Sequence, residues 1–294
     1  MRAYAELARP AQWLKNGFVL VGVLFGHAWN DSHALWGALT LFVAFCAVSS
    51  AVYAFNDVMD RHADRVHPHK RRRPVSSGRV SVRGALVFSV ALAAIGLGLA
   101  AGVSPQAAGV TAGYVALNLA YSLGIKHVAL LDVFFIAAGF MLRLLAGTVG
   151  LGIPPSRWLL LCGLMVTLFL GFAKRRAELA ALEHADGDGQ GARVPQRRAL
   201  ATYTLDLLDR LIAVSAAGAA IAYALYTVDD RTAAIQGTDK LVYTVPFVLY
   251  GIYRYLWLLY HRGIGADPSA QMPRDAHLVA AVACWLALTA ALIR

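Results

Sequence analysis

Residues 34–64 read ALWGALTLFVAFCAVSSAVYAFNDVMDRHAD, an apolar run followed at once by three aspartates. The run at 34–55 contains no Asp, Glu, Lys or Arg, and it is long enough to cross a bilayer, which takes about 20 helical residues. If the helix continues into the polar part, Asp57, Asp60 and Asp64 recur at intervals of three and four residues, and all three face one way. The sequence therefore predicts a membrane helix that ends in an acidic face.

Three carboxylates on one helix face need a counter-charge, unless they are simply solvated at the membrane surface. Mg²⁺ prefers oxygen ligands, and it is commonly shared between protein carboxylates and substrate phosphates. The most basic segment of the chain, KRRR at 70–73, follows a few residues later. Acidic residues next to a basic segment predict a Mg²⁺–diphosphate site, in which Asp57, Asp60 and Asp64 are metal ligands and catalytic residues.

The composition indicates a membrane protein throughout. Apolar residues make up 59% of the 294 positions, and charged residues make up 15%, whereas a soluble domain has about a quarter charged. Because the apolar runs are long and do not alternate with polar residues, we predict an all-α polytopic membrane protein rather than a β-barrel. The nine predicted helices are a short run ending near residue 29 and runs at about 34–55, 84–103, 107–125, 128–149, 158–173, 211–228, 241–260 and 278–293.

These runs form one predicted domain, 1–294, with polar inserts at about 56–83 and 174–209. Pro68 and Pro74 exclude a long continuous helix in the first insert, and the Gly- and Asp-rich stretch at 186–191 predicts a solvated loop in the second.

The net charge of +10 follows from membrane topology, so nucleic-acid binding is not needed to explain it. Most Lys and Arg residues lie at the N-terminus and in the loops after the second, fourth, sixth and eighth runs. The alternate loops hold only Arg157, Arg231 and Lys240. The positive-inside rule therefore predicts that both inserts and the N-terminus are cytoplasmic and that the C-terminus is outside, in the inner (plasma) membrane of the cell. The polar N-terminus predicts no cleavable signal peptide.

Other polar residues near the helix ends are candidate substrate ligands. Arg offers phosphate a planar fork of donors, and Lys offers a point charge. The candidates are Asn56, Lys15, Lys70, Arg71, Arg73, Tyr121, Lys126, Arg143, Lys174, Arg175 and Glu178.

Simpler roles stay open for several of these residues. Lys15 can extend to the interface, and the basic residues of either insert can meet anionic lipid headgroups. Arg143 lies within a predicted membrane helix, where a charge normally faces a cavity or a partner on another helix. It lies about 16 Å along the helix from Asp132, so the two are not expected to pair directly.

The stretch Asn56–Asp64 matches N-D-x-x-D-x-x-x-D, the first aspartate-rich motif of the UbiA superfamily of intramembrane prenyltransferases, and the chain resembles that superfamily. Within it, the sequence is most similar to the decaprenyl-phosphate phosphoribosyltransferase branch. The further matching pieces are Arg9-Pro10, Gln12-Trp13, Lys15-Asn16, Asp64-Arg65, His67-Pro68, Lys70-Arg71, Arg73-Pro74, Tyr121, Lys126-His127, Leu142-Arg143, Ala146-Gly147, Ser156, Trp158, Lys174-Arg175 and Glu178-Leu179.

The resemblance implies nine helices around a central polar cavity that opens to the cytoplasm. Aromatic prenyltransferases of the superfamily carry a second aspartate-rich motif after the sixth helix, where this chain has the basic stretch 174–176. A site with fewer acidic and more basic side chains than in those enzymes fits two phosphorylated substrates, phosphoribosyl pyrophosphate and a polyprenyl phosphate.

The implied reaction transfers 5-phosphoribose to the lipid phosphate and releases pyrophosphate, with Mg²⁺ as cofactor. Asp57, Asp60 and Asp64 would hold Mg²⁺, while Asn56 would orient them or contact the sugar. Lys70, Arg71 and Arg73 would neutralise the donor. Lys126, Lys174 and Arg175, with Lys15 and Arg143, would bind the lipid phosphate, and Glu178 would hold its basic neighbours in place.

Two alternatives remain at this stage. The same aspartates could bind a prenyl diphosphate and support transfer of the prenyl group to an aromatic or other small acceptor. The protein could instead be a transporter or binding protein for anionic solutes, with no covalent product. A homo-oligomer is compatible with all three hypotheses.

Overall fold

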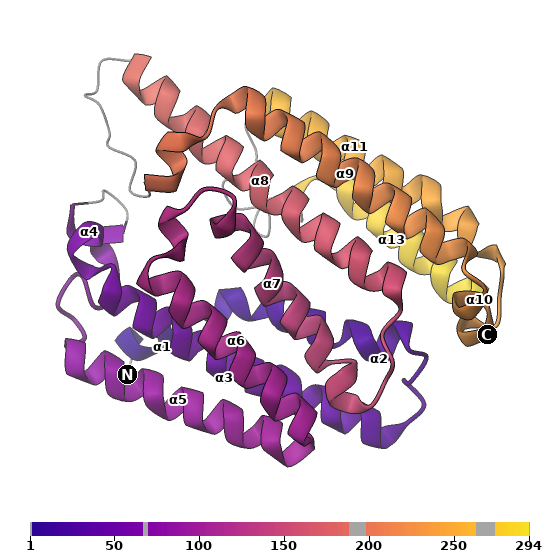
Figure 1. Cartoon of the computed structure of the whole chain (residues 1–294), viewed down its shortest axis with the longest axis horizontal. Coiled ribbons are helices and arrows are strands. Elements are labelled where there is room, and N and C mark those ends of the chain that lie inside the picture. The colour runs from indigo at the N-terminus through magenta and orange to yellow at the C-terminus, as the bar shows by residue number, and fades with distance from the viewer. Residues whose placement is uncertain (1, 67–69, 188–197, 263–273, 294) are drawn as a thin grey trace. The chain divides into compact units, whose positions relative to one another are not determined.

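Every regular element that the computed structural model describes, over residues 2–66, 70–187, 198–262 and 274–293, is a helix (Figure 1). In this part of the chain six helices are long and apolar enough to cross a membrane: Ser32–Met59, Val82–Val103, Leu131–Leu151, Arg157–Glu183, Leu205–Val228 and Lys240–His261. A shorter apolar helix covers Ala276–Leu292. The all-α membrane class is confirmed, while the number of nine crossing helices stays a prediction.

The chain divides into two compact units, which we describe separately. The first comprises Met1–Lys126 and Gly139–Pro155, and the second comprises His127–Ala138 and Ser156–Arg294. The division falls within helix α7, Leu131–Ala146.

The first unit holds most of the predicted site. Its helices are α1 (Arg2–Ala8), η1 (Pro10–Val19), α2 (Val21–Phe25), α3 (Ser32–Met59), α4 (Arg61–Arg65), η2 (Lys70–Arg72), α5 (Val82–Val103), α6 (Pro105–Leu123), the second half of α7, and η4 (Val149–Leu151); η3 (Ile125–His127) ends just beyond it. Three long helices begin at a side-chain cap, because Asp31, Ser81 and Ser104 each accept a hydrogen bond from a backbone N–H of the first turn.

Helix α3 is the centre of this unit, with α5 and α6 packed against it. Phe45 of α3 is fully buried and lies 5.2 Å from Tyr114 of α6, ring centroid to ring centroid. A Cβ atom on Gly96 of α5 would lie 2.7 Å from the carbonyl oxygen of Ala44, so only glycine allows α5 to approach α3 this closely.

The first apolar run is not one continuous α-helix, since it is divided into η1 and α2. Its backbone lies directly against the end of α7. A Cβ on Gly147 would overlap the backbone of Val19, and a Cβ on Gly22 would overlap the backbone of Gly147. Two glycines therefore allow two backbones to touch.

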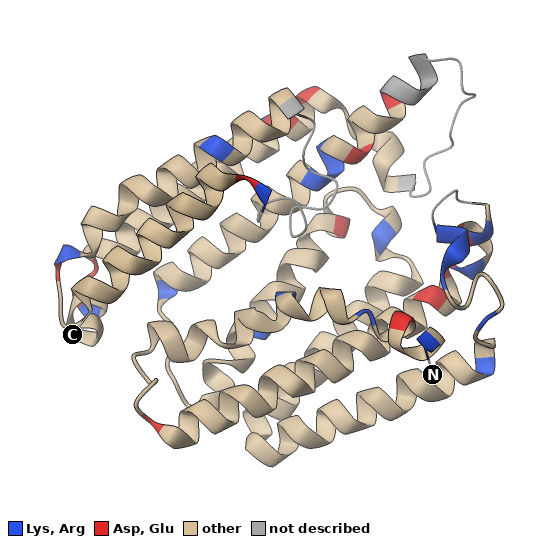
Figure 2. Cartoon of the chain, turned by 180° about the vertical axis from the view of Figure 1, so that it is seen from behind, with Lys and Arg blue, Asp and Glu red and all other residues tan. Residues whose placement is uncertain are grey.

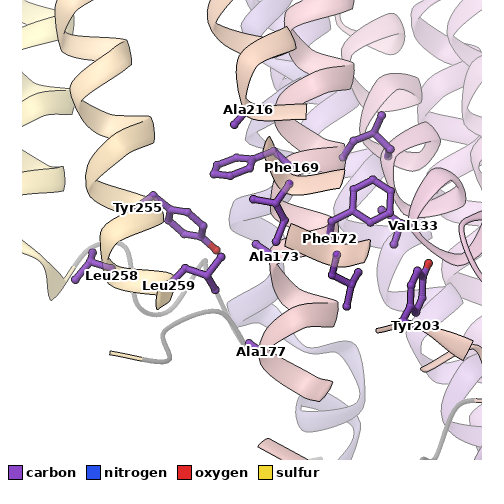
Figure 3. Close-up of a cluster of buried hydrophobic side chains, with 14 of the residues drawn as sticks. Val133, Phe169, Phe172, Ala173, Ala177, Tyr203, Ala216, Tyr255, Leu258 and Leu259 are labelled. Carbon is purple, nitrogen blue, oxygen red and sulfur yellow. The ribbon is translucent and has the colours of Figure 1, made fainter. Parts of the chain in front are cut away.

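The second unit contains the first half of α7, α8 (Arg157–Gly187), η5 (Arg198–Thr202), α9 (Leu205–Val228), α10 (Asp230–Gln236), η6 (Lys240–Thr244), α11 (Val245–Arg262) and α13 (Ala276–Leu292). Figure 3 shows its buried core, where Phe169 and Phe172 of α8 lie among residues of α7, α9 and α11. The ring centroids of Phe169 and Tyr255 are 5.2 Å apart.

Large apolar side chains cover the outward faces of the long helices. Trp36 and Val43 of α3, Val87 of α5, and Val214 and Ile221 of α9 are all exposed. Charged residues lie mostly at helix ends and in connections (Figure 2). Such apolar surfaces suit contact with lipid, so the chain is an integral membrane protein.

The acidic stretch differs from the continuous helix predicted for it. Helix α3 ends at Met59, Asp60 forms a turn, and α4 begins at Arg61. The turn keeps helix-like hydrogen bonds, because the Asp60 N–H donates to the Asn56 carbonyl at 2.9 Å and the Asp64 N–H donates to the Asp60 carbonyl at 2.8 Å.

The connections agree with the sequence where they are described. Among the described residues between α4 and α5, 66 and 70–81, only η2 is regular, as the prolines predicted. The dipeptide His67-Pro68 and residues 188–191 of the predicted loop in the second insert lie outside the described residues.

Candidate active site

Asp57 is almost completely buried at the end of α3, with 1% of its surface exposed. Its Oδ1 atom accepts a hydrogen bond from Arg9 Nη2 at 2.5 Å and one from Arg73 Nη1 at 3.2 Å. A buried carboxylate without such partners would cost several kcal/mol. Two cations from distant parts of the chain therefore neutralise Asp57.

Asp64, in α4, is fully buried and receives a hydrogen bond from Arg73 at 2.6 Å. The donor atom is the same Nη1 that contacts Asp57. One guanidinium nitrogen thus bridges the first and third aspartates of the motif.

Asp60 lies in a different environment. Its side chain is 27% exposed and pairs with Lys126, which is itself buried and follows α6. Asn56 donates to the other oxygen of Asp60 at 3.0 Å, and Ser122 donates to the amide oxygen of Asn56 at 3.2 Å. Asn56 therefore holds one oxygen of Asp60, while the three carboxylates do not converge on one point.

Arg9 is a member of this cluster that the predicted site did not include. It has φ of 53°, a left-handed conformation that non-glycine residues rarely adopt and that is concentrated at functional sites. The residue links α1 to η1, and its guanidinium carbon lies 5.2 Å from the ring centroid of Tyr53. The only signal in the sequence was the Arg9-Pro10 pair within the family resemblance.

The donor set fits a divalent cation that is shared with a substrate. Among the described residues, no three His, Cys, Asp or Glu side chains gather closely enough to form a metal cage. However, Asp57 and Asp64 both lie near Arg73 Nη1, at 3.2 Å and 2.6 Å, so one positive charge already occupies a point between two carboxylates. Mg²⁺ is typically held by one or two carboxylates, with substrate phosphates and water as further ligands.

Arg143 was a candidate phosphate ligand, and the structure gives it several protein partners. It is 5% exposed. It donates to Asn16 at 2.8 Å, to the Gly139 carbonyl at 3.0 Å and to the Tyr114 hydroxyl at 2.8 Å. No carboxylate lies within ion-pairing distance of Arg143 in the described part of the chain, so the buried positive charge is held by neutral oxygens and by the rings of Tyr114 and Phe140, whose centroids lie 4.6 Å and 5.1 Å from its guanidinium carbon.

Arg175, in the second unit, is also a central member of an ionic network. It is 1% exposed, and it donates to Asp132 at 2.6 Å and to Glu178 at 2.5 Å. The Tyr203 hydroxyl donates to the other oxygen of Asp132 at 2.9 Å and accepts from the Leu130 N–H at 2.7 Å. Burial raises the pKa of Tyr203 well above its usual value, which keeps the hydroxyl protonated as a donor. Arg175 is therefore held by two carboxylates, those of Glu178 and Asp132.

The remaining candidates are partly accessible. Lys15, Lys70, Tyr121 and Lys174 are half-buried, whereas Arg71 is exposed. Sequence reasoning missed four participants in these networks, namely Arg9, Ser122, Tyr203 and the pairing role of Asp132.

Comparisons with known proteins agree on a family. The sequence model of the UbiA prenyltransferase family matches residues 17–278. The decaprenyl-phosphate phosphoribosyltransferase of Mycolicibacterium smegmatis is 32% identical over 84% of this chain and 80% of that protein. The protein of the same name from Corynebacterium glutamicum is 36% identical over 84% of this chain and 74% of its own length.

A solved structure shares the fold. A UbiA homologue from Archaeoglobus fulgidus, bound to GPP and Mg²⁺, superposes with a TM-score of 0.68 over 98% of this chain and 99% of that chain. Its sequence identity is 17%, so this likeness concerns the fold alone.

Proposed function

Because this chain belongs to the UbiA prenyltransferase family, we propose that it transfers 5-phosphoribose from phosphoribosyl pyrophosphate to a polyprenyl phosphate and releases pyrophosphate. The observation that supports the substrate pair most directly is the extent of the similarity to two phosphoribosyltransferases, which covers more than four-fifths of this chain. The protein is then an enzyme, a pentosyl transferase of the membrane.

The charges of the first unit suit the donor substrate. Asp57 and Asp64, with Asp60 beside them, are the proposed ligands of a divalent cation, for which Mg²⁺ is the first choice because the family fold has been solved with it. When bound, that ion would neutralise the diphosphate as it departs. Arg73 would bind the diphosphate oxygens, with Lys70 and Arg71 contributing further positive charge.

The reaction needs little acid–base chemistry from the protein. As the bond from the anomeric carbon to the diphosphate oxygen breaks, that carbon becomes oxocarbenium-like, and an oxygen of the lipid phosphate forms the new bond. The electron pair of the broken bond leaves with pyrophosphate. The attacking phosphate is already anionic, so positioning and charge stabilisation are the main requirements.

The acceptor phosphate requires cations of its own. In the first unit we assign Lys126 to it, with Lys15 and Tyr121 near the headgroup, and the family resemblance adds Lys174 as a candidate from the second unit. Arg143 and Arg175 are held by protein partners, so we propose that each supports the structure of its own unit, with Glu178 orienting Arg175.

The finer topology is part of the proposal. Nine helices in a single domain, 1–294, would surround a polar cavity that opens to the cytoplasm, with inserts at about 56–83 and 174–209 on that side. The basic residues of both inserts support a cytoplasmic face and an inner-membrane location. Labelling of single cysteines at Arg71 and at Tyr243 with a membrane-impermeant reagent should separate the two sides.

The function can be tested with the purified full chain in lipid nanodiscs. Incubation with Mg²⁺, phosphoribosyl pyrophosphate and decaprenyl phosphate should yield a lipid heavier by one phosphoribosyl group in mass spectra, with one pyrophosphate released per product. Absence of both products would exclude the proposal. Formation of a prenylated phenol from a prenyl diphosphate would instead support the rival prenyl transfer, and solute uptake without a covalent product would indicate a transporter.

A further inference from the structure

Around Asp57 and Asp64, the negative charges lie deepest in the protein and the positive charges lie nearer to the surface. The two carboxylate side chains are 1% and 0% exposed, whereas the side chains of Arg9 and Arg73, whose guanidinium groups contact them, are 27% and 24% exposed. A ligand approaching from solvent therefore meets the arginine side chains before it meets the carboxylates.

A divalent cation that binds Asp57 Oδ1 and Asp64 Oδ2 would have to displace the guanidinium groups that contact these atoms. Arg73 Nη1 lies between the two carboxylates, and Arg9 Nη2 is 2.5 Å from the Asp57 oxygen that Arg73 also contacts. If a metal arrived alone, it would leave two guanidinium groups beside a new positive charge. If a diphosphate arrived alone, it would compete with two buried carboxylates for the same donors. Either event alone is therefore unfavourable.

Binding of the metal and the diphosphate together is favourable. A metal-bound diphosphate brings both the cation that the carboxylates need and the anionic oxygens that the arginines need. We propose that Arg9, together with Arg73, is an exchangeable counter-ion: it neutralises the buried aspartates when no metal is bound and transfers to the diphosphate when the metal–diphosphate complex enters. The inference rests on the proposed function only in taking a diphosphate as part of the donor.

The backbone of Arg9 is consistent with this role. Its φ of 53° positions the guanidinium over Asp57 at a cost that nearby contacts must offset, which is typical of residues at binding sites and switches. Lys126 and Asp60 show the opposite order, a buried cation and a more exposed carboxylate, so the exchange applies to the arginine pair and not to them.

The test measures two ligands separately, and the exchange predicts effects of opposite sign. In the full chain in nanodiscs, Mn²⁺ binding without diphosphate is measured by electron paramagnetic resonance, and labelled pyrophosphate binding is measured at saturating Mg²⁺. Arg9→Gln frees the Asp57 oxygen, so Mn²⁺ alone should bind about fivefold more tightly, while Mg²⁺–pyrophosphate should bind about tenfold more weakly. The matched control is Arg61→Gln, since Arg61 contacts only the Val58 carbonyl among the contacts described and should change neither affinity by more than about twofold.

Each other outcome overturns the inference in its own way. If Arg9→Gln weakens both ligands, Arg9 is only structural. If Mn²⁺ binding is unchanged and pyrophosphate binding falls, Arg9 is an ordinary phosphate ligand. If both ligands bind more tightly, Arg9 merely blocks the carboxylates. Arg9→Lys keeps the charge and should restore both affinities in part, which guards against misfolding of the glutamine variant.

These measurements separate the inference from the proposed reaction. They use pyrophosphate and no lipid, so effects of opposite sign can be found even if no phosphoribosylated lipid forms. Conversely, product formation with effects of the same sign would reject the exchange and leave the reaction intact.

Discussion

Asp57 and Asp64 share one hydrogen-bond donor, the Nη1 atom of Arg73, at 3.2 Å and 2.6 Å. The first aspartate ends α3 and the second lies in α4, beyond the turn at Asp60. Asp57 and Asp64 are both buried and both depend on the same guanidinium, so they form one ion-paired cluster. Asp60 instead pairs with Lys126. The three aspartates of the motif should therefore differ in what their loss does.

Removing the charge of either bridged aspartate should abolish most of the activity. Asp57→Asn and Asp64→Asn each take away a proposed metal ligand and one of the two carboxylates that Arg73 contacts. We expect pyrophosphate release to fall roughly 100-fold or more. Glu6→Gln is the matched control, because Glu6 pairs with Arg79 at 2.7 Å and not with the site. Activity within about threefold of the wild type in Asp57→Asn would contradict the assignment.

Removing the metal should stop the reaction without unfolding the protein. The buried carboxylates already have cation partners in its absence, so no uncompensated charge remains when the metal is chelated. We expect EDTA to abolish pyrophosphate release, Mg²⁺ to restore it, and the midpoint of thermal unfolding to change by less than about 3 °C. A much larger fall in the midpoint would mean that the metal, rather than Arg9 and Arg73, neutralises these aspartates.

The long helices of this fold could be predicted from the sequence because length and the absence of charge are sufficient evidence for a membrane span. The caps of α5 and α6 follow from Ser81 and Ser104, which precede the apolar runs. The division of the first run into η1 and α2 could not be predicted, since it depends on contact between Val19 and Gly147, far apart in the chain.

The site could be predicted in part, and for a similar reason. The motif identified the aspartates, and the resemblance identified Lys126 and Arg175 as residues to consider. Which cation pairs with which carboxylate is decided by tertiary packing, so the Arg9–Asp57 and Arg175–Asp132 pairs were not visible in the sequence. Spacing also could not reveal that Asp60 pairs with Lys126 and not with the arginine that bridges the other two aspartates, because tertiary packing decides that pairing.

Arg143 should be required for stability through its planar fork of donors. Arg143→Lys keeps the positive charge but cannot donate to Asn16 and Tyr114 from fixed directions. We expect a loss of about 2 kcal/mol or more in the free energy of unfolding in detergent, because hydrogen bonds from a charged donor are lost. Tyr114→Phe removes a single hydrogen bond and should lose less, about 0.5–1.5 kcal/mol. Tyr243→Phe, at a tyrosine that is 64% exposed, is the control and should have no measurable effect.

The pair formed by Arg175 and Asp132 should be worth far more than a surface pair of the same chemistry. Both side chains are at most 2% exposed, so Asp132→Leu removes a carboxylate partner from a buried cation and should cost roughly 3–5 kcal/mol. Arg210→Met breaks an exposed pair with Asp206 and should cost about 0.5 kcal/mol or less.

The double variant provides the decisive comparison. Replacing both partners, as Arg175→Met with Asp132→Leu, should recover part of the loss, because no uncompensated buried charge remains. The measurement is thermal unfolding of the wild type, the two single variants and the double variant. If the loss of stability in the double variant equals the sum of the losses in the two single variants, Arg175 and Asp132 stabilise the second unit independently.

Gly147 should be intolerant of a methyl group because of its position against the N-terminal segment. A Cβ at this position would overlap the carbonyl of Val19, and neither backbone can move without disturbing the Asn16–Arg143 hydrogen bond nearby. We expect Gly147→Ala to cost at least about 1–3 kcal/mol, as overpacking of a close contact does. Gly98 in α5 has no neighbour within 4 Å of an added Cβ, so Gly98→Ala should instead gain about 0.5–1 kcal/mol from helix propensity. Opposite shifts of the two unfolding midpoints would confirm the close approach, and equal shifts would show that η1 does not lie against the end of α7.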